Sequence, residues 1–167
     1  MGARLFAALM PFVCGLLGVV VSNLPVTLFG GLVPPPLLGF IPIYFWCLVR
    51  PDLMTPAATF AIGILQDVMS GGPPGIWTLS FVVAYAVIQR QRDAFAGLSG
   101  IAAVLGFATA TLIVCFIAYV ATALLYHPAP VGPIVAELAI TVLFYIPGAF
   151  VVGAVHRRLV GPLRSDF

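Results

Sequence analysis

Residues 50–75 have the sequence RPDLMTPAATFAIGILQDVMSGGPPG, in which one apolar run joins a charged cluster to a turn rich in glycine and proline. A helix from Arg50 to Asp67 would be roughly 25 Å long at a rise of about 1.5 Å per residue. This length is close to the hydrocarbon thickness of a bilayer, about 30 Å. The segment therefore predicts a helix that has Arg50 at one membrane face and Asp67 just inside the other.

The composition of the whole chain favours a membrane environment. Of its 167 residues, 62% are hydrophobic and 7% are charged, whereas about 25% of the residues of an ordinary soluble domain are charged. A chain of this length has room for roughly six crossings of about 20 residues each. We expect a single integral membrane domain over residues 1–167, with no soluble catalytic domain and no nucleic-acid binding.

Six apolar runs predict an all-α membrane protein, a compact bundle of six transmembrane helices. The first run is expected to be an uncleaved span, because no signal-peptide cleavage site precedes Asn23. The second run is short and contains Pro42, so it must begin near residue 32, lie tilted or be sheltered by neighbouring helices. The expected spans are residues 5–28, 32–49, 53–69, 76–88, 98–125 and 131–155.

The arginines indicate how these spans are oriented. The chain has seven arginines and no lysine. If the N-terminus is cytoplasmic, six crossings place every arginine on the cytoplasmic side and leave the opposite loops without any, as the positive-inside rule requires. We therefore expect a multi-pass protein of the cytoplasmic membrane with both termini in the cytoplasm. The arginines are Arg4, Arg50, Arg90, Arg92, Arg157, Arg158 and Arg164.

Asp67 is one of two acidic residues inside the expected spans, and it has two interpretations. In the structural interpretation, its carboxylate accepts N–H hydrogen bonds from the glycine-rich turn that follows and orients the next helix. In the functional interpretation, Asp67 contacts a partner protein or a ligand. Gly63, one helical turn earlier on the same face, would allow another helix to approach closely.

Glu137 is the second acidic residue within a span, about 10 Å into the sixth expected helix. We expect its face to pack against a matching face of the fifth helix, with the carboxyl group directed inward. Packing of the two helices is the structural interpretation, and a proton or ligand site is the functional one. The two faces consist of Glu137, Thr141, Tyr145 and Gly148, and of Thr111, Cys115, Ala118 and Thr122.

No pattern in the sequence indicates catalysis. There is no Ser–His–Asp set, metal-ligand spacing or phosphate-binding loop, so we expect a non-enzymatic protein without cofactor or metal. The three cysteines lie within apolar runs and are interpreted as small core residues. Tyr44, Phe45 and Trp46 are expected to form an aromatic belt at the cytoplasmic interface, with Trp77 at the opposite interface.

The central part of the chain resembles the MreD family, the integral membrane component of the bacterial rod-shape machinery, or elongasome. The resemblance is close over residues 37–90, and elsewhere it depends on size and the number of spans. The sequence departs from the family pattern in its doubled Pro73-Pro74. Two motifs carry the resemblance: Pro42-x-Tyr44-Phe45-Trp46-x-Leu48-x-Arg50-Pro51 and Phe60-x-x-Gly63-x-Leu65-x-Asp67-x-x-Ser70-Gly71-x-Pro73-x-Gly75.

This resemblance implies an inner-membrane scaffold that is required for rod cell shape. Its implied partners are MreC, the MreB filament, and RodA with its class B penicillin-binding transpeptidase, in contact with membrane lipids. MreD-like proteins are also similar in fold to the substrate-binding S components of energy-coupling vitamin transporters. The motif residues implied to shape the structure or a partner surface are Pro42, Arg50, Pro51, Gly63, Asp67, Ser70, Gly71, Pro73 and Gly75.

A second functional hypothesis follows from that similarity to S components. In it, the protein is a small-molecule binding module, and a ligand enters an outward-facing cavity lined by Asp67, Trp77 and Glu137. The sequence leaves open whether the chain acts as a monomer or a homodimer, and whether a lipid binds between its helices.

Overall fold

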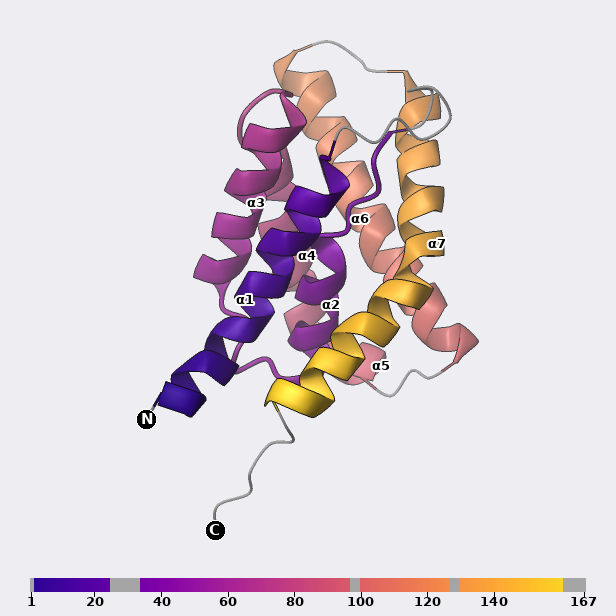
Figure 1. The fold of residues 1–167 in the computed structure, drawn as a ribbon. Coiled ribbons are helices and arrows are strands. Elements are labelled where there is room, and N and C mark those ends of the chain that lie inside the picture. The colour runs from indigo at the N-terminus through magenta and orange to yellow at the C-terminus, as the bar shows by residue number, and fades with distance from the viewer. Residues whose placement is uncertain (1, 25–33, 97–99, 127–129, 161–167) are drawn as a thin grey trace.

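The computed structural model describes residues 2–24, 34–96, 100–126 and 130–160. Within these ranges the regular structure is helical and contains no strand, which confirms the predicted all-α class. The helices pack side by side as a bundle (Figure 1). They are α1 (Gly2–Ser22), α2 (Phe40–Val49), α3 (Pro56–Ser70), α4 (Ile76–Arg90), α5 (Arg92–Ala96), α6 (Ile101–Leu125) and α7 (Val131–Val155), and a π-helical turn, His156–Val160, continues α7.

Two of these helices are long and apolar enough to cross a membrane, namely α6 and α7 together with its π-helical turn. Helices α1, α2 and α3 are shorter than the spans expected from the sequence, whereas α4 ends at Arg90, two residues beyond its expected span. Helix α1 ends at Ser22, whereas the first expected span continues to residue 28. Parts of three expected spans, residues 25–28, 32–33 and 98–99, lie outside the described residues.

Helix α2 lies in the centre of the bundle. It has 10 residues, which corresponds to a length of about 15 Å. It contacts α1, α4, α6 and α7, and seven of its side chains are buried. Neighbouring helices therefore shelter this short run, which is one of the three solutions that the sequence allows.

The non-helical residues before α2 form hydrogen bonds with two other helices. The Leu37 N–H donates to Thr141 Oγ1 of α7 at 3.0 Å, and the Leu38 N–H donates to Ser22 Oγ of α1 at 3.0 Å. Gly18 makes this approach possible, because a Cβ atom there would lie 2.7 Å from the Leu38 carbonyl oxygen. Non-helical backbone is thus satisfied by protein groups, as it must be away from water.

We expect Thr141→Val to destabilise the fold by about 1–3 kcal/mol, because valine keeps the shape of threonine and leaves the buried Leu37 N–H without its acceptor. Thr109→Val is the matched control, since the exposed Thr109 hydroxyl donates only to Leu105 within its own helix. Unfolding of the purified protein in mixed micelles, followed by circular dichroism, compares the two. Equal stability of both variants would contradict this role for Thr141.

The prediction that Tyr44 and Trp46 belong to an aromatic belt near Arg50 is wrong, because these side chains are buried, with exposed fractions of 1% and 0%. Because α2 is enclosed by its neighbours, its aromatic side chains fill the space between helices rather than reach an interface. Tyr145 of α7 stacks on Phe107 of α6, with ring centroids 4.2 Å apart. The rings of the central cluster belong to Phe40, Tyr44, Phe81, Phe107 and Tyr145.

Local signals in the sequence set both ends of α3. Thr55 is the N-cap, and its side-chain oxygen accepts a hydrogen bond from the Ala58 N–H at 3.1 Å. Pro56 occupies the first helical position, where its missing N–H costs nothing. The helix ends at Gly71, whose φ of +65° is the left-handed conformation that glycine adopts readily.

Candidate functional site

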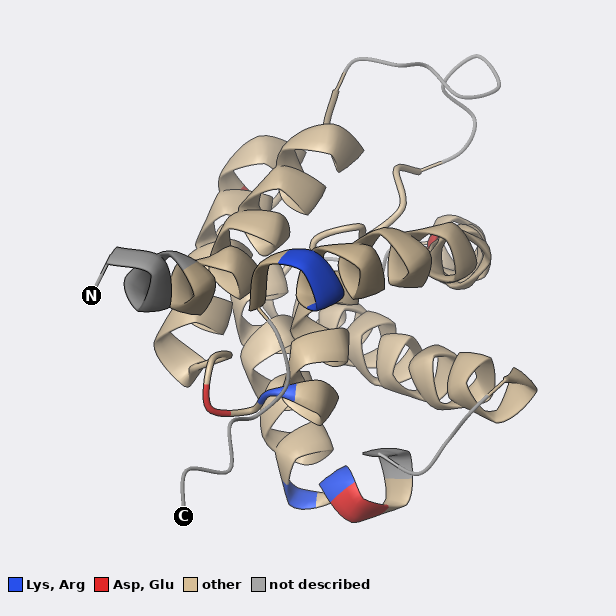
Figure 2. Cartoon of the chain, turned by 60° about the horizontal axis from the view of Figure 1, so that its bottom comes forward, with Lys and Arg blue, Asp and Glu red and all other residues tan. Residues whose placement is uncertain are grey.

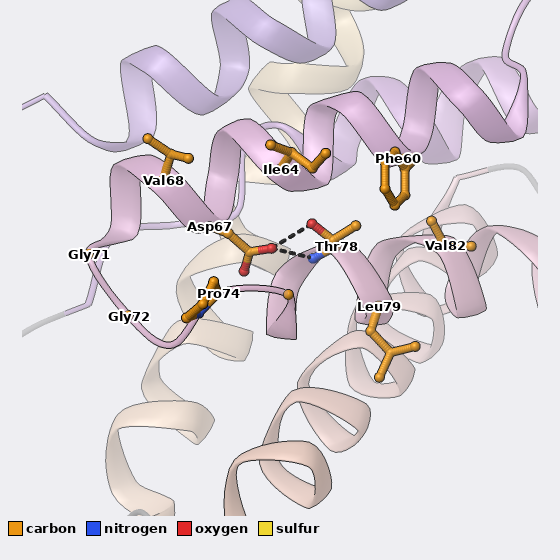
Figure 3. Close-up of a pocket in the computed structure, with 11 residues that line it drawn as sticks. Phe60, Ile64, Asp67, Val68, Gly71, Gly72, Pro74, Thr78, Leu79 and Val82 are labelled. Carbon is orange, nitrogen blue, oxygen red and sulfur yellow. Dashed lines mark hydrogen bonds between the residues drawn. The ribbon is translucent and has the colours of Figure 1, made fainter. Parts of the chain in front are cut away.

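The carboxylate of Asp67 joins the end of α3 to the start of α4. Its Oδ1 accepts a hydrogen bond from the Trp77 N–H at 2.8 Å, and its Oδ2 accepts one from the Thr78 N–H at 3.1 Å. The Thr78 hydroxyl donates a further, short hydrogen bond to Oδ2 (Figure 3). Two free N–H groups in the first turn of a helix need an acceptor. Asp67 therefore serves as the cap of α4, a task that the actual N-cap residue, Gly75, cannot perform.

These hydrogen bonds agree with the structural interpretation of Asp67, in which its carboxylate accepts N–H groups and orients the next helix, except in one respect. The donors lie in the first turn of α4 rather than in the glycine-rich turn that precedes it. The turn reverses the chain so that α4 packs along α3, and Asp67 is 6% exposed as a result. A buried carboxylate that accepts three hydrogen bonds is held in one orientation, so Asp67 fixes the angle between the two helices.

Gly63 is the point of closest approach between α3 and α4. A Cβ atom at this position would lie 2.6 Å from Thr78 Cα and 3.2 Å from the Thr78 backbone nitrogen. No side chain fits there unless the backbone of α4 moves. Gly63 and Asp67 therefore act on the same residue of α4, the glycine by allowing contact and the carboxylate by hydrogen bonding.

The outer face of this helix pair carries an open hollow of about 620 Å³, which we call the α3–α4 groove (Figure 3). Its wall is mostly apolar, and Asp67 and Thr78 are its polar members. Several of the apolar side chains are well exposed, and Val68 is the most exposed of them at 73%. The groove is lined by Phe60, Ile64, Asp67, Val68, Gly71, Gly72, Pro74, Gly75, Thr78, Leu79 and Val82.

The structure brings some of the predicted motif residues together and separates others. Gly63, Asp67, Gly71 and Gly75 all belong to the α3–α4 pair. At the end of α3, the Ser70 hydroxyl donates to the Asp67 carbonyl oxygen at 3.2 Å. Pro73 lines a different cavity, Pro42 is buried in α2, and Arg50 and Pro51 lie at the end of α2, away from the groove.

Arg50 and Asp52 form an ion pair just after α2. Arg50 Nη2 lies 2.8 Å from Asp52 Oδ2, and Arg50 Nε donates to Oδ1 at 3.0 Å. These hydrogen bonds lower the pKa of Asp52 below its ordinary value. The pair stabilises the fold at pH values above the unfolded-state pKa of Asp52, and this contribution is lost as the pH falls through the folded-state pKa. Since the Asp52 side chain is 45% exposed, the contribution is small, about 0.2–1 kcal/mol.

We expect Arg50→Gln to raise the pKa of Asp52 toward about 3.9, the value of an isolated aspartate. Carbon-13 NMR of the Asp52 carboxyl group, recorded over a pH titration, measures this change. Arg158→Gln is the control, because exposed Arg158 is not among the groups that shift the Asp52 pKa. Identical titration of Asp52 in the two variants would rule out the pairing.

The described arginines gather at one end of the bundle. Arg50 follows α2, Arg90 ends α4 and Arg92 begins α5. The π-helical turn after α7 carries Arg157 and Arg158, and α1 begins at the same end (Figures 1 and 2). The side chain of Arg4 and all of Arg164 lie outside the described residues.

Glu137 lines a second cavity of about 180 Å³, here called the Glu137 cavity. The predicted packing of its helix face is correct in part. Glu137 shares the cavity with Cys115, Ala118 and Thr122 of α6, as expected. Farther along the same face, Thr141 accepts its hydrogen bond from the segment before α2, and a Cβ atom at Gly148 would lie 2.8 Å from Ile41 of α2.

The ligand cavity of the second hypothesis does not form as expected. Trp77 and Glu137 line one cavity, whereas Asp67 lines the α3–α4 groove. The separation arises because the Asp67 carboxylate is bound to the first turn of α4.

Sequence reasoning missed the hydroxyl groups of Ser22 and Thr141 as partners of the non-helical segment before α2, because nothing local links residues so far apart in the chain. It also passed over Gln66, which is 2% exposed and whose Oε1 finds no hydrogen-bond donor among the described residues. The sequence offered one signal for Gln66, because its amide stands next to Asp67 within an apolar run. Within the described ranges, no three histidine, cysteine or acidic side chains are close enough to hold a metal ion.

The resemblance to the MreD family depends on the two sequence motifs, and the structure shows how the second of them builds one helix pair. No protein-family model, no curated protein and no solved structure matches the chain.

Proposed function

We propose that this chain is a non-enzymatic scaffold of the MreD type in the bacterial inner membrane. In this role it links MreC and MreB to RodA and its class B penicillin-binding transpeptidase, and so maintains rod cell shape. One observation carries the proposal: the second family motif builds a helix pair of fixed geometry that presents an apolar groove. Its glycine and aspartate residues hold the two helices together, while the side chains between them remain exposed.

Several features support a multi-pass membrane protein with six spans and cytoplasmic termini. Large apolar side chains are exposed on the outer faces of the helices, including Phe116, Leu143 and Phe150 at 63%, 66% and 72%. So much exposed apolar surface is unfavourable in water and suits lipid. The described arginines at one end of the bundle fit a cytoplasmic face, which would hold α5 and the π-helical turn near the MreB filament.

The α3–α4 groove suits an apolar helix from the membrane region of MreC. Helices in lipid associate through close packing, because lipid chains compete equally for apolar surface. A groove between two helices offers more packing contact to a third helix than a single convex helix does. The hydrogen bonds of Asp67 keep the groove walls in place before the partner arrives, which reduces the entropy lost on binding.

An affinity pull-down of the tagged protein in mild detergent, with partners identified by mass spectrometry, tests the proposal. We expect the wild-type protein to recover MreC together with MreB or the elongation synthase. Val68→Trp, which fills the groove, should recover less MreC, whereas Leu143→Trp on α7 should recover as much as wild type. Recovery of an ABC-type ATPase module instead of MreC would contradict the scaffold function and favour a transporter.

A further inference from the structure

The Glu137 cavity lies between α4, α6 and α7 and contains one acidic side chain. Glu137 is 9% exposed, and no described residue donates a hydrogen bond to its carboxyl group. It is the one charged residue among the described residues that line the cavity. The described arginines lie at the opposite end of the bundle (Figure 2). An acidic side chain inside an apolar helix, without a hydrogen-bond partner among the described residues, is costly to place there, so the cavity is a candidate ligand site.

The rest of the cavity wall narrows the chemistry of that ligand. Trp77 contributes an indole ring, whose face attracts cations. The Thr122 hydroxyl uses its proton to bond the Ala118 carbonyl oxygen at 2.8 Å, so its free lone pairs can only accept. Ile134 and Cys115 complete a wall of low polarity. The Glu137 carboxyl group and the Thr122 oxygen can accept hydrogen bonds, and the face of an indole ring attracts positive charge, so these three groups together favour a cation.

The volume of the cavity suits a small ligand. A space of about 180 Å³ corresponds to several water molecules, each of which occupies about 30 Å³ in the liquid. A small organic cation is of comparable bulk.

We propose that the Glu137 cavity binds a small organic cation of the choline or tetramethylammonium class. The Glu137 carboxylate balances the positive charge, and the Trp77 ring contacts the methylated head group. The Thr122 oxygen accepts a hydrogen bond from a hydroxyl or N–H group of the ligand. This site is separate from the proposed scaffold surface, because the α3–α4 groove uses Thr78, Leu79 and Val82 of α4, and the cavity uses Ile76 and Trp77.

Equilibrium dialysis of labelled choline against the purified protein in an uncharged detergent tests this proposal without any partner protein. We expect saturable binding of one choline per chain, and competition by tetramethylammonium. The alcohol 3,3-dimethylbutan-1-ol has the shape of choline but carbon in place of the charged nitrogen, and it should not compete. Absence of saturable choline binding, or equal competition by the alcohol, would overturn the proposal.

Glu137→Gln tests the role of the charge, because glutamine keeps the size of the side chain. We expect choline affinity to fall about tenfold or more, the effect of losing one favourable charge interaction of about 1.4 kcal/mol. Asp93→Asn, which removes an exposed acid at the other end of the bundle, should leave the affinity unchanged. Unchanged binding by Glu137→Gln would overturn the proposal. If that variant does not fold, the comparison of choline with the alcohol on the wild-type protein decides.

Discussion

Asp67→Ala is expected to lower the free energy of unfolding by about 3 kcal/mol or more, one of the two largest effects in this chain. The substitution removes three hydrogen bonds to a charged acceptor and leaves the Trp77 and Thr78 N–H groups without partners. Hydrogen bonds to charged groups contribute about 1.5–3 kcal/mol each, and an unsatisfied buried donor costs about 1–3 kcal/mol. The three losses share one carboxylate, so they do not simply add.

Unfolding by sodium dodecyl sulfate in mixed micelles, followed by helical circular dichroism, measures this loss. Asp67→Asn should fall between Asp67→Ala and wild type, because the amide keeps one carbonyl acceptor. Ser70→Ala should stay within about 0.5 kcal/mol of wild type, since the exposed Ser70 bonds only to the carbonyl oxygen of its own helix. If Asp67→Ala were as stable as Ser70→Ala, the carboxylate would not be the cap of α4.

Gly63→Ala is expected to destabilise the protein by about 1–3 kcal/mol, the usual cost of placing extra atoms in a packed interior. The added Cβ would lie 2.6 Å from the Thr78 Cα, so α4 must move away from α3. That movement also lengthens the Asp67 hydrogen bonds to Thr78. Helix propensity alone would make alanine more favourable than glycine by about 1 kcal/mol, so a loss of stability measures the steric conflict directly.

Gly153→Ala is the matched control for Gly63→Ala. A Cβ atom at position 153, within α7, would lie 3.5 Å from the end of the Arg157 side chain, an ordinary van der Waals distance, so we expect this variant to be as stable as wild type or slightly more stable. The same unfolding measurement compares the two. A Gly63→Ala protein as stable as Gly153→Ala would contradict the close contact between α3 and α4.

The all-helical class and the local signals at helix ends could be predicted from the sequence. Pro56 and Gly71 act through the backbone conformation of their own positions, so no distant contact is needed to interpret them. The role of Asp67 was foreseen for a related reason. A carboxylate that lies just before a glycine-rich loop can reach only N–H groups close to that loop. That these donors belong to the first residues of α4 depends on how the chain reverses its direction there.

The errors concern contacts between distant segments. Trp46 was placed at an interface because Arg50 follows it closely, but its burial depends on α2 being the central helix, which no local pattern shows. The start of α2 at Phe40 depends on hydroxyl acceptors 16 and 104 residues away in the chain. The second functional hypothesis places Asp67 and Glu137 in one cavity, but the cap of α4 separates them.

In vivo photo-crosslinking from Val68 tests the central claim, that the α3–α4 groove receives the membrane region of MreC. A benzoylphenylalanine residue replaces Val68 in the groove or, as the control, Leu143, an exposed residue of α7. The scaffold function predicts a crosslink to MreC from position 68 and little or none from position 143. Crosslinking from position 143 that equals or exceeds crosslinking from position 68, or no crosslink to MreC from position 68, would contradict it.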